Sequence, residues 1–262
     1  MLSDTNTAVT VDEVSKRYQL RAGRGQELKS TLLSLPSSIF RRKPAATKDF
    51  WALQDISFML QRGECLGITG PNGSGKSTLL RIIAGITHPT SGRIVANGRV
   101  SALLELGSGF HPQISGRENA LLNAVLLGLS LDEARDALPS IFEFAELGDF
   151  IEQPIRTYSS GMLIRLGFAV AVHVQPEILL VDEVLAVGDA EFQSKCFGHI
   201  RRLREKGVTI IIASHDLPSI QKYTDRAMLL EHGRIVLEGK PVQVLHEYLT
   251  RVFGPGEVAE VT

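Results

Sequence analysis

Nine consecutive residues carry the groups that hold the phosphates of a nucleotide. The segment Gly70-Pro-Asn-Gly-Ser-Gly-Lys-Ser-Thr78 matches the P-loop pattern, in which two glycines frame a lysine and a serine. Glycines let backbone N–H groups approach phosphate oxygens without a Cβ in the way. Lys76 is expected to reach the β- and γ-phosphates, and Ser77 to offer its hydroxyl to Mg²⁺. The predicted phosphate-binding residues are Gly70, Asn72, Gly73, Ser74, Gly75, Lys76, Ser77 and Thr78.

Two continuous apolar runs are followed by polar side chains that could take part in hydrolysis of a bound phosphate. Residues 177–182 and 208–214 have the composition of parallel strands that are buried on both faces. Asp182 closes the first run at the ligand-binding edge of such a sheet, where it would hold Mg²⁺. Glu183 is then the candidate general base, and His215 is placed to hold the attacking water. A solvated acidic turn and a structural histidine are the alternative interpretations.

A second anion-binding helix end is predicted at Thr157-Tyr-Ser-Ser-Gly-Met162. Ser159 or Ser160 can cap the helix that runs from 163 to 174, and Gly161 leaves its N-terminus open. On its own the segment is typical of an ordinary helix cap. Its position shortly before the strand of Asp182 favours the anion-binding interpretation.

These side chains require a particular order of strands and helices. A strand at 64–69 must precede the P-loop, and a helix that begins near Leu79 must follow it. We expect an α/β fold with a mostly parallel central sheet, an N-terminal antiparallel β subdomain and a helical subdomain inserted at about residues 107–175. The further expected elements are strands at 9–20, 50–60 and 92–98, helices at 117–128 and 131–145, a hairpin at 226–238 and a last helix at 242–249.

Composition sets outer bounds on the function. The chain has 262 residues, 44% of them hydrophobic, and a net charge of -1, so no overall positive field draws it to nucleic acid. Cys65 and Cys196 are too few and too far apart for a zinc site or a disulfide framework. The N-terminus lacks the pattern of a signal peptide, and no apolar run approaches the length of a membrane span.

One segment is strongly basic although the chain as a whole is not. Residues 21–48 contain seven Lys or Arg residues and one Glu. Leu28, Leu32, Leu35 and Ile39 fall at near-helical spacing, which predicts a short amphipathic helix followed by a flexible Arg41-Arg-Lys43 loop. Such an insertion can be a solvated loop, or it can lie against anionic lipid or the pyrophosphate head of a lipid-linked substrate.

The order of these motifs resembles that of ATP-binding-cassette ATPases over almost the whole chain. The resemblance rests on Tyr18, the P-loop, the helical insert, the Ser159 segment, Leu179-Leu-Val-Asp-Glu183 and Ser214-His215. It implies that Tyr18 stacks on adenine, with Trp51 as a weaker candidate, and that Asp189 is the aspartate of the D-loop. It also implies that two copies close head to tail around two ATP molecules. Ser159, Ser160 and Gly161 of one copy would then reach the ATP of the other.

Several sequence motifs resemble those of one group within that family, the ATPase subunits of polysaccharide exporters. They are Tyr158-Ser-Ser-Gly-Met162 where the family usually has Leu-Ser-Gly-Gly-Gln, the segment Leu103–Pro112, and Ser115-Gly-Arg-Glu-Asn119. The glutamine that usually contacts Mg²⁺ is missing from 104–106, and Glu105 is the nearest polar residue. We expect a single nucleotide-binding domain over residues 1–250, a flexible tail at 251–262, and no C-terminal carbohydrate-binding domain.

The resemblance implies an ATPase that powers export of a lipid-linked polysaccharide of O-antigen or teichoic-acid type. Its partners would be a second copy of itself and two copies of a membrane-spanning permease, at the cytoplasmic face of the membrane, with Mg²⁺ as cofactor and no nucleic acid. A cassette ATPase for another cargo, such as a drug, a lipid or a small solute, is the first alternative. A cassette ATPase that acts on nucleic acid or ribosomes, and a nucleotide-binding scaffold, are the others.

Overall fold

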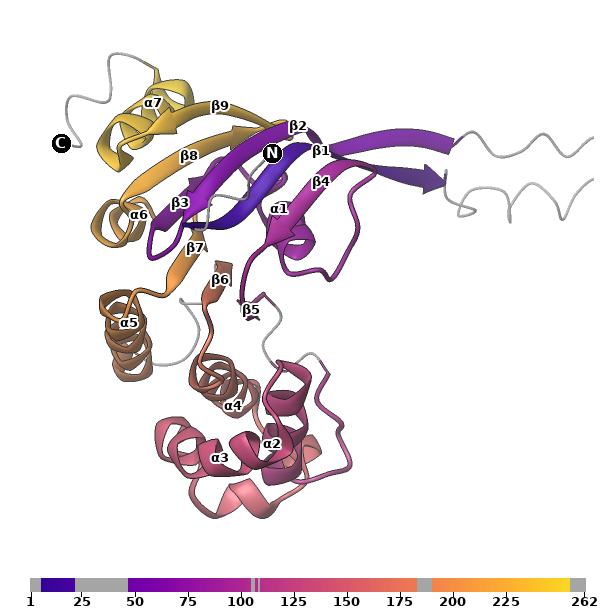
Figure 1. The fold of residues 1–262 in the computed structure, drawn as a ribbon, viewed down its shortest axis with the longest axis vertical. Helices are drawn as coiled ribbons and strands as arrows, with labels where there is room; N and C mark the ends of the chain where they lie inside the picture. Colours follow the sequence, from indigo (N-terminus) through magenta and orange to yellow (C-terminus); the bar gives the residue numbers. More distant parts are fainter. Residues whose placement is uncertain (1–5, 22–46, 105–106, 108, 183–189, 255–262) are drawn as a thin grey trace, which may run out of the picture.

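A six-stranded sheet forms the centre of the computed structural model, which describes residues 6–21, 47–104, 107, 109–182 and 190–254 (Figure 1). Its strands follow the order β5-β6-β7-β3-β8-β9, and all neighbours are parallel except β8 and β9. The strands are β3 (Cys65–Thr69), β5 (Val100–Leu103), β6 (Ile178–Asp182), β7 (Thr209–Ala213), β8 (Arg226–Glu231) and β9 (Arg234–Gly239). The predicted mostly parallel sheet is confirmed, and the predicted hairpin is β8–β9.

A second, antiparallel sheet has the order β2-β1-β4 and confirms the predicted N-terminal β subdomain. It is built from β1 (Thr7–Arg21), β2 (Thr47–Gln61) and β4 (Ser91–Ala96). The far ends of β1 and β2 extend beyond the rest of the molecule as a two-stranded arm (Figure 1). Asp55 has a positive φ of 52° and lies at a register shift. Because this irregularity changes the alternation of side chains between the two faces of the strand, Leu53 and Ile56 are both buried although they lie three positions apart.

The helices surround the central sheet, and three of them, α2, α3 and α4, form a helical group of their own. The P-loop helix α1 begins at Lys76, three residues before the predicted start at Leu79, because Gly75 adopts a left-handed N-cap with φ 112°. Helices α2, α3 and α4 pack on one another and lie away from the β1–β2 arm (Figure 1). The helices are α1 (Lys76–Ile83), α2 (Gly116–Leu126), α3 (Leu131–Ala145), η1 (Gly148–Glu152), η2 (Ile155–Thr157), α4 (Ser160–His173), α5 (Ala190–Glu205), α6 (Leu217–Tyr223) and α7 (Pro241–Phe253). None of the helices in the described part of the chain is both long enough and apolar enough to cross a membrane.

Two apolar cores lie on the two faces of the central sheet. Alternate residues of one strand belong to different cores: Leu179 packs with the helical group, and Leu180 packs with α1 and the antiparallel sheet. Both residues are 0% exposed. The continuous apolar run in β6 is therefore explained by burial on both faces.

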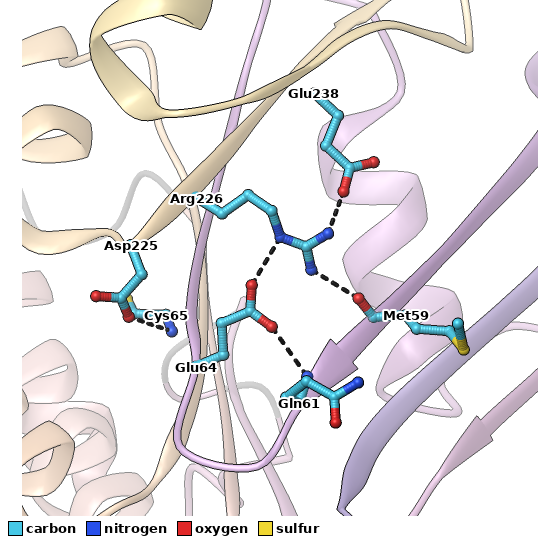
Figure 2. A network of polar contacts seen from close by, with 7 residues as sticks. All are labelled: Met59, Gln61, Glu64, Cys65, Asp225, Arg226 and Glu238. Atoms are coloured by element: carbon cyan, nitrogen blue, oxygen red, sulfur yellow. Dashed lines mark hydrogen bonds and ion pairs between the residues drawn. The ribbon is translucent and has the colours of Figure 1, made fainter. Parts of the chain in front are cut away.

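A polar network at the amino ends of the strands ties the β2–β3 turn to β8 and β9 (Figure 2). The Arg226 guanidinium pairs with Glu64 at 2.7 Å, donates to the Met59 carbonyl at 2.6 Å and also pairs with Glu238. The Glu64 carboxylate in turn accepts from the Gln61 N–H at 2.9 Å. Since Arg226 is partly buried, losing one of its carboxylates costs more than losing a surface ion pair. The network holds the sheet edge opposite to the P-loop.

Candidate functional site

The P-loop, Asp182 and His215 lie together at the carboxyl edge of the central sheet. Asp182 pairs with Ala213 across β6 and β7, and Ala213 pairs with Ile68 across β7 and β3. The P-loop follows β3, and the exposed His215 stands two residues after Ala213. Helix α1 packs against β6 and β7. This is the edge at which parallel α/β sheets bind ligands.

The P-loop is closed around the lysine ammonium. Lys76 is only 6% exposed, and its Nζ donates to the carbonyl oxygens of Gly70 at 2.8 Å and Pro71 at 3.2 Å. Gly75 is required by packing as well as by its left-handed φ, because a Cβ there would lie 2.6 Å from the Ala52 carbonyl oxygen. The loop thus holds a positive charge at the N-terminus of α1, where phosphate groups bind.

The β8–β9 turn is hydrogen-bonded to the P-loop and to β2. The Gly233 N–H donates to the Ser74 carbonyl at 2.9 Å, and the Gly233 carbonyl accepts from the Gln54 N–H at 2.7 Å. Gly233 has φ 75°, and a Cβ there would lie 2.7 Å from the Ala52 carbonyl oxygen. The turn thereby joins three segments far apart in the sequence: the P-loop, β2 and the last hairpin.

A cleft of about 240 Å³ lies beside the P-loop and contains most of the predicted ATP contacts. Tyr18 and Phe50 are paired residues of β1 and β2, and both line this cleft. Trp51 pairs instead with Arg17, whose guanidinium lies 5.6 Å from the centre of the Trp51 ring. Strand alternation therefore puts Trp51 on the other face of the arm. The cleft is lined by Tyr18, Phe50, Ala52, Asn72, Gly73, Ser74, Gly75, Lys76, Ser77 and Thr78.

The residues at this edge fit ATP with Mg²⁺. The Ser77 hydroxyl and the Asp182 carboxylate, both half-buried, supply the oxygen ligands that Mg²⁺ prefers. Two hydroxyl oxygens at the loop, Thr69 Oγ1 and Ser74 Oγ, are buried without a hydrogen-bond partner among the described residues. Buried polar atoms normally have partners, so these oxygens suit a loop that is completed by its ligand.

The predicted second anion-binding site is an exposed helix N-terminus. Ser159, not Ser160, caps α4: its Oγ accepts from the Met162 N–H at 3.2 Å, and Ser160 is the first helical residue. Tyr158 is buried and donates to the Phe150 carbonyl at 2.6 Å, which fixes the approach to the helix. A Cβ at Gly161 would have only Ser159 Oγ, at 3.8 Å, nearby among the described residues. No residue of this segment lines the P-loop cleft.

Several predicted residues lie outside the described part of the chain. They are Glu105, Glu183 and Asp189, together with residues 22–46 of the basic insertion and 255–262 of the tail. The segment that follows Glu105 is anchored by Asn119, which is 0% exposed. Asn119 Oδ1 accepts from the His111 N–H at 2.7 Å, and Nδ2 donates to the Ser115 carbonyl at 2.9 Å. The motif Ser115-Gly-Arg-Glu-Asn119 therefore begins helix α2 and also holds the preceding loop through hydrogen bonds.

An apolar groove opens next to this loop, between the helical group and the core. It has a volume of about 200 Å³ and is lined mainly by small and apolar residues: Ala84, Ile86, Val100, Ala102, Gly107, Phe110, Asn123, Leu127, Gly167, Val170 and Ala171. Ile86 on its rim is 59% exposed, and Leu126 on neighbouring α2 is 68% exposed. Exposed apolar side chains gathered beside a groove are typical of a protein-binding surface.

Comparison with known proteins gives matches along most of the chain. A family model described as ABC transporter matches residues 53–186. The O-antigen export system ATP-binding protein RfbB of Klebsiella pneumoniae is 43% identical over 92% of this chain and 96% of RfbB. The teichoic acids export ATP-binding protein TagH of Listeria innocua serovar 6a is 39% identical over 93% of this chain and 70% of TagH. The ABC transporter protein AbcA of Aeromonas salmonicida is 49% identical over 78% of this chain, which spans 66% of AbcA.

A solved structure has the same fold. It is a dimeric structure of the ATP-binding cassette MJ0796 in a post-hydrolysis state, bound to ADP and Pi. The two folds agree with a TM-score of 0.70 and 22% sequence identity, covering 89% of this chain and 98% of that one. At that identity the likeness concerns the arrangement of strands and helices.

Proposed function

The chain belongs to the ABC transporter family, and we propose that it is the ATP-hydrolysing subunit of an exporter for a lipid-linked polysaccharide. The single observation that carries the cargo is the 43% identity to an O-antigen export ATP-binding protein over 96% of that protein's length. The relative named for teichoic acids export supports the same class of substrate, a polymer of sugars or sugar phosphates. The sequence motifs that contain Tyr158 and Asn119 also resemble those of polysaccharide-exporter ATPases.

ATP binds in the cleft beside the P-loop. The backbone N–H groups of residues 73–78 and the Lys76 ammonium hold the phosphates, and Tyr18 stacks on the adenine. Ser77 and Asp182 would hold Mg²⁺, and the metal would supply positive charge beside the phosphates. The buried hydroxyls of Thr69 and Ser74 gain partners when the nucleotide and its water enter.

Hydrolysis requires a base and a group that orients the attacking water. Glu183, directly after the strand of Asp182, takes the proton of the water as general base. His215 reaches the same edge from the end of β7 and holds the water in line with the γ-phosphate. The exposed position of His215 leaves its ring accessible to ATP.

Each ATP site is completed by a second copy of the chain. Within one chain the Ser159 segment does not line the cleft that holds the P-loop. The N-terminus of α4 is nevertheless solvent-facing and suited to an anion, with no acidic residue in its first turn. Ser159, Ser160 and Gly161 of one copy would contact the γ-phosphate bound by its partner, and Asp189 would lie at the interface. Two ATP molecules thus hold two copies head to tail.

The apolar groove next to the Asn119-anchored loop receives a cytoplasmic helix of a permease. Its lining of Ile86, Phe110 and Leu127 suits the apolar face of an amphipathic helix. Two copies of the chain would serve two permease subunits, which places this subunit at the cytoplasmic face of the membrane. Closing and reopening of the ATP-bound pair then moves the loop after Glu105 against the permease.

The cargo can be tested in a bacterium that carries the gene. Deleting the gene is expected to remove the polysaccharide from the cell surface and to accumulate its lipid-linked form inside. The wild-type gene should restore export, as should Lys206→Ala, which changes an exposed lysine outside the P-loop. Lys76→Ala should fail to restore it. Normal surface polysaccharide together with loss of export of a drug, lipid or small solute would instead establish another cargo.

A further inference from the structure

One carboxylate joins the three helices α3, α4 and α5. Glu146 caps the C-terminus of α3 in a left-handed conformation, with φ 54°. Its Oε1 lies 2.5 Å from Lys195 Nζ on α5, and its Oε2 lies 3.2 Å from Arg165 Nη1 on α4. A non-glycine residue in this conformation costs free energy, so the surrounding contacts must favour it. The two ion pairs are such contacts.

Aromatic rings hold both cations in place. Lys195 Nζ lies 4.7 Å from the centre of the Phe144 ring and donates to the Phe144 carbonyl at 2.9 Å. The Arg165 guanidinium lies 4.6 Å from the centre of the Phe192 ring. Phe144 and Phe192 themselves pack edge to face at 5.9 Å. The cations are therefore restrained before they meet Glu146, which strengthens the pairing relative to that of freely moving surface side chains.

The two helices that Glu146 joins carry different parts of the proposed ATP site. Arg165 stands six residues after Ser159, on the helix whose N-terminus would reach the partner's ATP. Lys195 lies on α5, which begins at Ala190, shortly after Asp182 along the chain. A change in the angle between α4 and α5 would move Ser159 relative to the sheet edge that holds Asp182.

We propose that Glu146 is a positioning residue that fixes the angle between α4 and α5, so that Ser159 of one copy meets the ATP bound by the other. The inference rests on the proposed head-to-tail pairing. Loss of the carboxylate charge should slow hydrolysis in the dimer and weaken the cooperativity between its two sites. It should leave nucleotide binding to a single P-loop cleft unchanged, because Glu146 is not part of that cleft.

The chain offers a matched control for this experiment. Glu152 pairs with Arg117 at 2.5 Å, and the side chain of Glu152 is 58% exposed against 54% for Glu146. The Arg117 guanidinium also lies over an aromatic ring, that of Phe142, at 4.8 Å. This pair joins α2 to η1 within the helical group and does not reach α5. Glu152→Gln therefore removes a comparable ion pair without releasing the joint between α4 and α5.

The test compares Glu146→Gln, Glu152→Gln and wild type as full-length chains. ATP hydrolysis is measured against ATP concentration, binding of fluorescent ADP reports on the single cleft, and thermal unfolding reports on stability. Glu146→Gln is expected to lower kcat about fivefold or more and to bring the Hill coefficient towards 1, with ADP affinity within about twofold of wild type. Glu152→Gln should keep kcat within about twofold of wild type at a similar loss of thermal stability.

Three results would overturn the inference. Glu146→Gln with wild-type kcat and cooperativity would show that the pairing has no part in the reaction. An equal loss of kcat in Glu152→Gln, or a loss of ADP affinity that accounts for the loss of kcat, would assign the effect to general destabilisation or to binding. A wild-type chain that neither hydrolyses ATP nor pairs in its presence would overturn the proposed function itself, and this inference with it.

Discussion

Tyr18 and Phe50 lie opposite each other on β1 and β2, and both rings line the cleft beside the P-loop. Tyr18 is 38% exposed and Phe50 is 46% exposed, so both are accessible to a ligand, and Lys16 Nζ lies 5.2 Å from the centre of the Tyr18 ring. A nucleotide base in the cleft can therefore be held by two rings from one pair of strands. Phe50 was not among the residues predicted from the sequence.

Removing either ring should weaken ATP binding. Stacking of a base on an aromatic side chain contributes about 1–3 kcal/mol, so Tyr18→Ala and Phe50→Ala should each raise the Kd for a fluorescent ATP analogue about tenfold. Trp51→Ala is the control, because Trp51 faces Arg17 on the other side of the arm. If Trp51→Ala weakens binding and Phe50→Ala does not, the assignment of faces is wrong.

Glycine substitutions in the P-loop should differ according to the space around each Cα. Gly75→Ala places a Cβ 2.6 Å from the Ala52 carbonyl oxygen and should abolish ATP binding, with a loss of about 3 kcal/mol or more in the free energy of unfolding. Gly73→Ala meets no described atom within 4 Å and bears only the left-handed backbone strain, about 1–2 kcal/mol.

Gly198, in the interior of α5, is the control for these substitutions. A Cβ there also meets no described atom within 4 Å, and no left-handed backbone is involved. Gly198→Ala should stabilise the chain by about 0.5–1 kcal/mol in urea unfolding. Equal losses at Gly73 and Gly75 would contradict the packing argument.

The sequence predicted the parts of the fold that depend on local patterns. The P-loop, the buried strand before it and the β8–β9 hairpin each have a short-range signature, and the structure contains all three. The four-residue strand β5 was not predicted, since it is defined by long-range pairing of Val100 with Ile178. Helix α5 was also missed, although Phe192, Cys196, Ile200 and Leu203 recur at helical spacing and form its buried face.

Some residues of the candidate site can be proposed from residue type alone, whereas others depend on geometry that the sequence does not give. The lysine and serine of the P-loop and the aspartate at the end of β6 can be recognised from residue type and order in the sequence. Phe50 and Trp51 are neighbouring aromatic residues, and the register of β1 against β2 decides which of them faces the cleft. That register depends on positions with irregular backbone conformation, such as Asp55, and no local sequence pattern predicts them. The anchoring role of Asn119 likewise depends on contacts made only in the folded chain.

Replacing Asn119 should separate stability from coupling to the permease. Asn119→Ala leaves the His111 N–H without its acceptor and removes the amide's bonds to the Ile114 and Ser115 carbonyls, which keep backbone donors, so it should cost about 1–3 kcal/mol in the free energy of unfolding. At temperatures where the variant remains folded, its basal ATPase should persist and stimulation by the permease should fall. Gln113→Ala, an exposed change in the same loop, should do neither. Full stimulation in a folded Asn119→Ala chain would contradict the coupling role of the loop.

Two neighbouring histidines make stability depend on pH. Burial, with a smaller contribution from the positive charge of nearby groups, lowers the pKa of His199 to about 4, and burial also lowers the pKa of His173. The unfolded chain takes up the proton near the ordinary pKa of 6.5, so the folded state loses stability as the pH falls from about 6.5 to about 4.

His199→Gln should remove part of this dependence. Because His199 is only partly buried, we expect a difference of roughly 1–2 kcal/mol between the pH profiles of variant and wild type. Unfolding in urea at pH 7 and pH 5 measures it, with the exposed His246→Gln as the control for loss of one imidazole. A variant that loses as much stability as wild type on acidification would show that His199 does not titrate as described.

The most direct test of the central claim is ATP hydrolysis and pairing by wild type and Glu183→Gln, with and without the membrane permease. The account predicts that wild type hydrolyses ATP and that Glu183→Gln is slower by about a hundredfold or more, because the general base is lost. The variant should instead form a stable ATP-bound dimer on size-exclusion chromatography. A variant that hydrolyses ATP as fast as wild type would contradict the assignment of Glu183 and the proposed mechanism of the site.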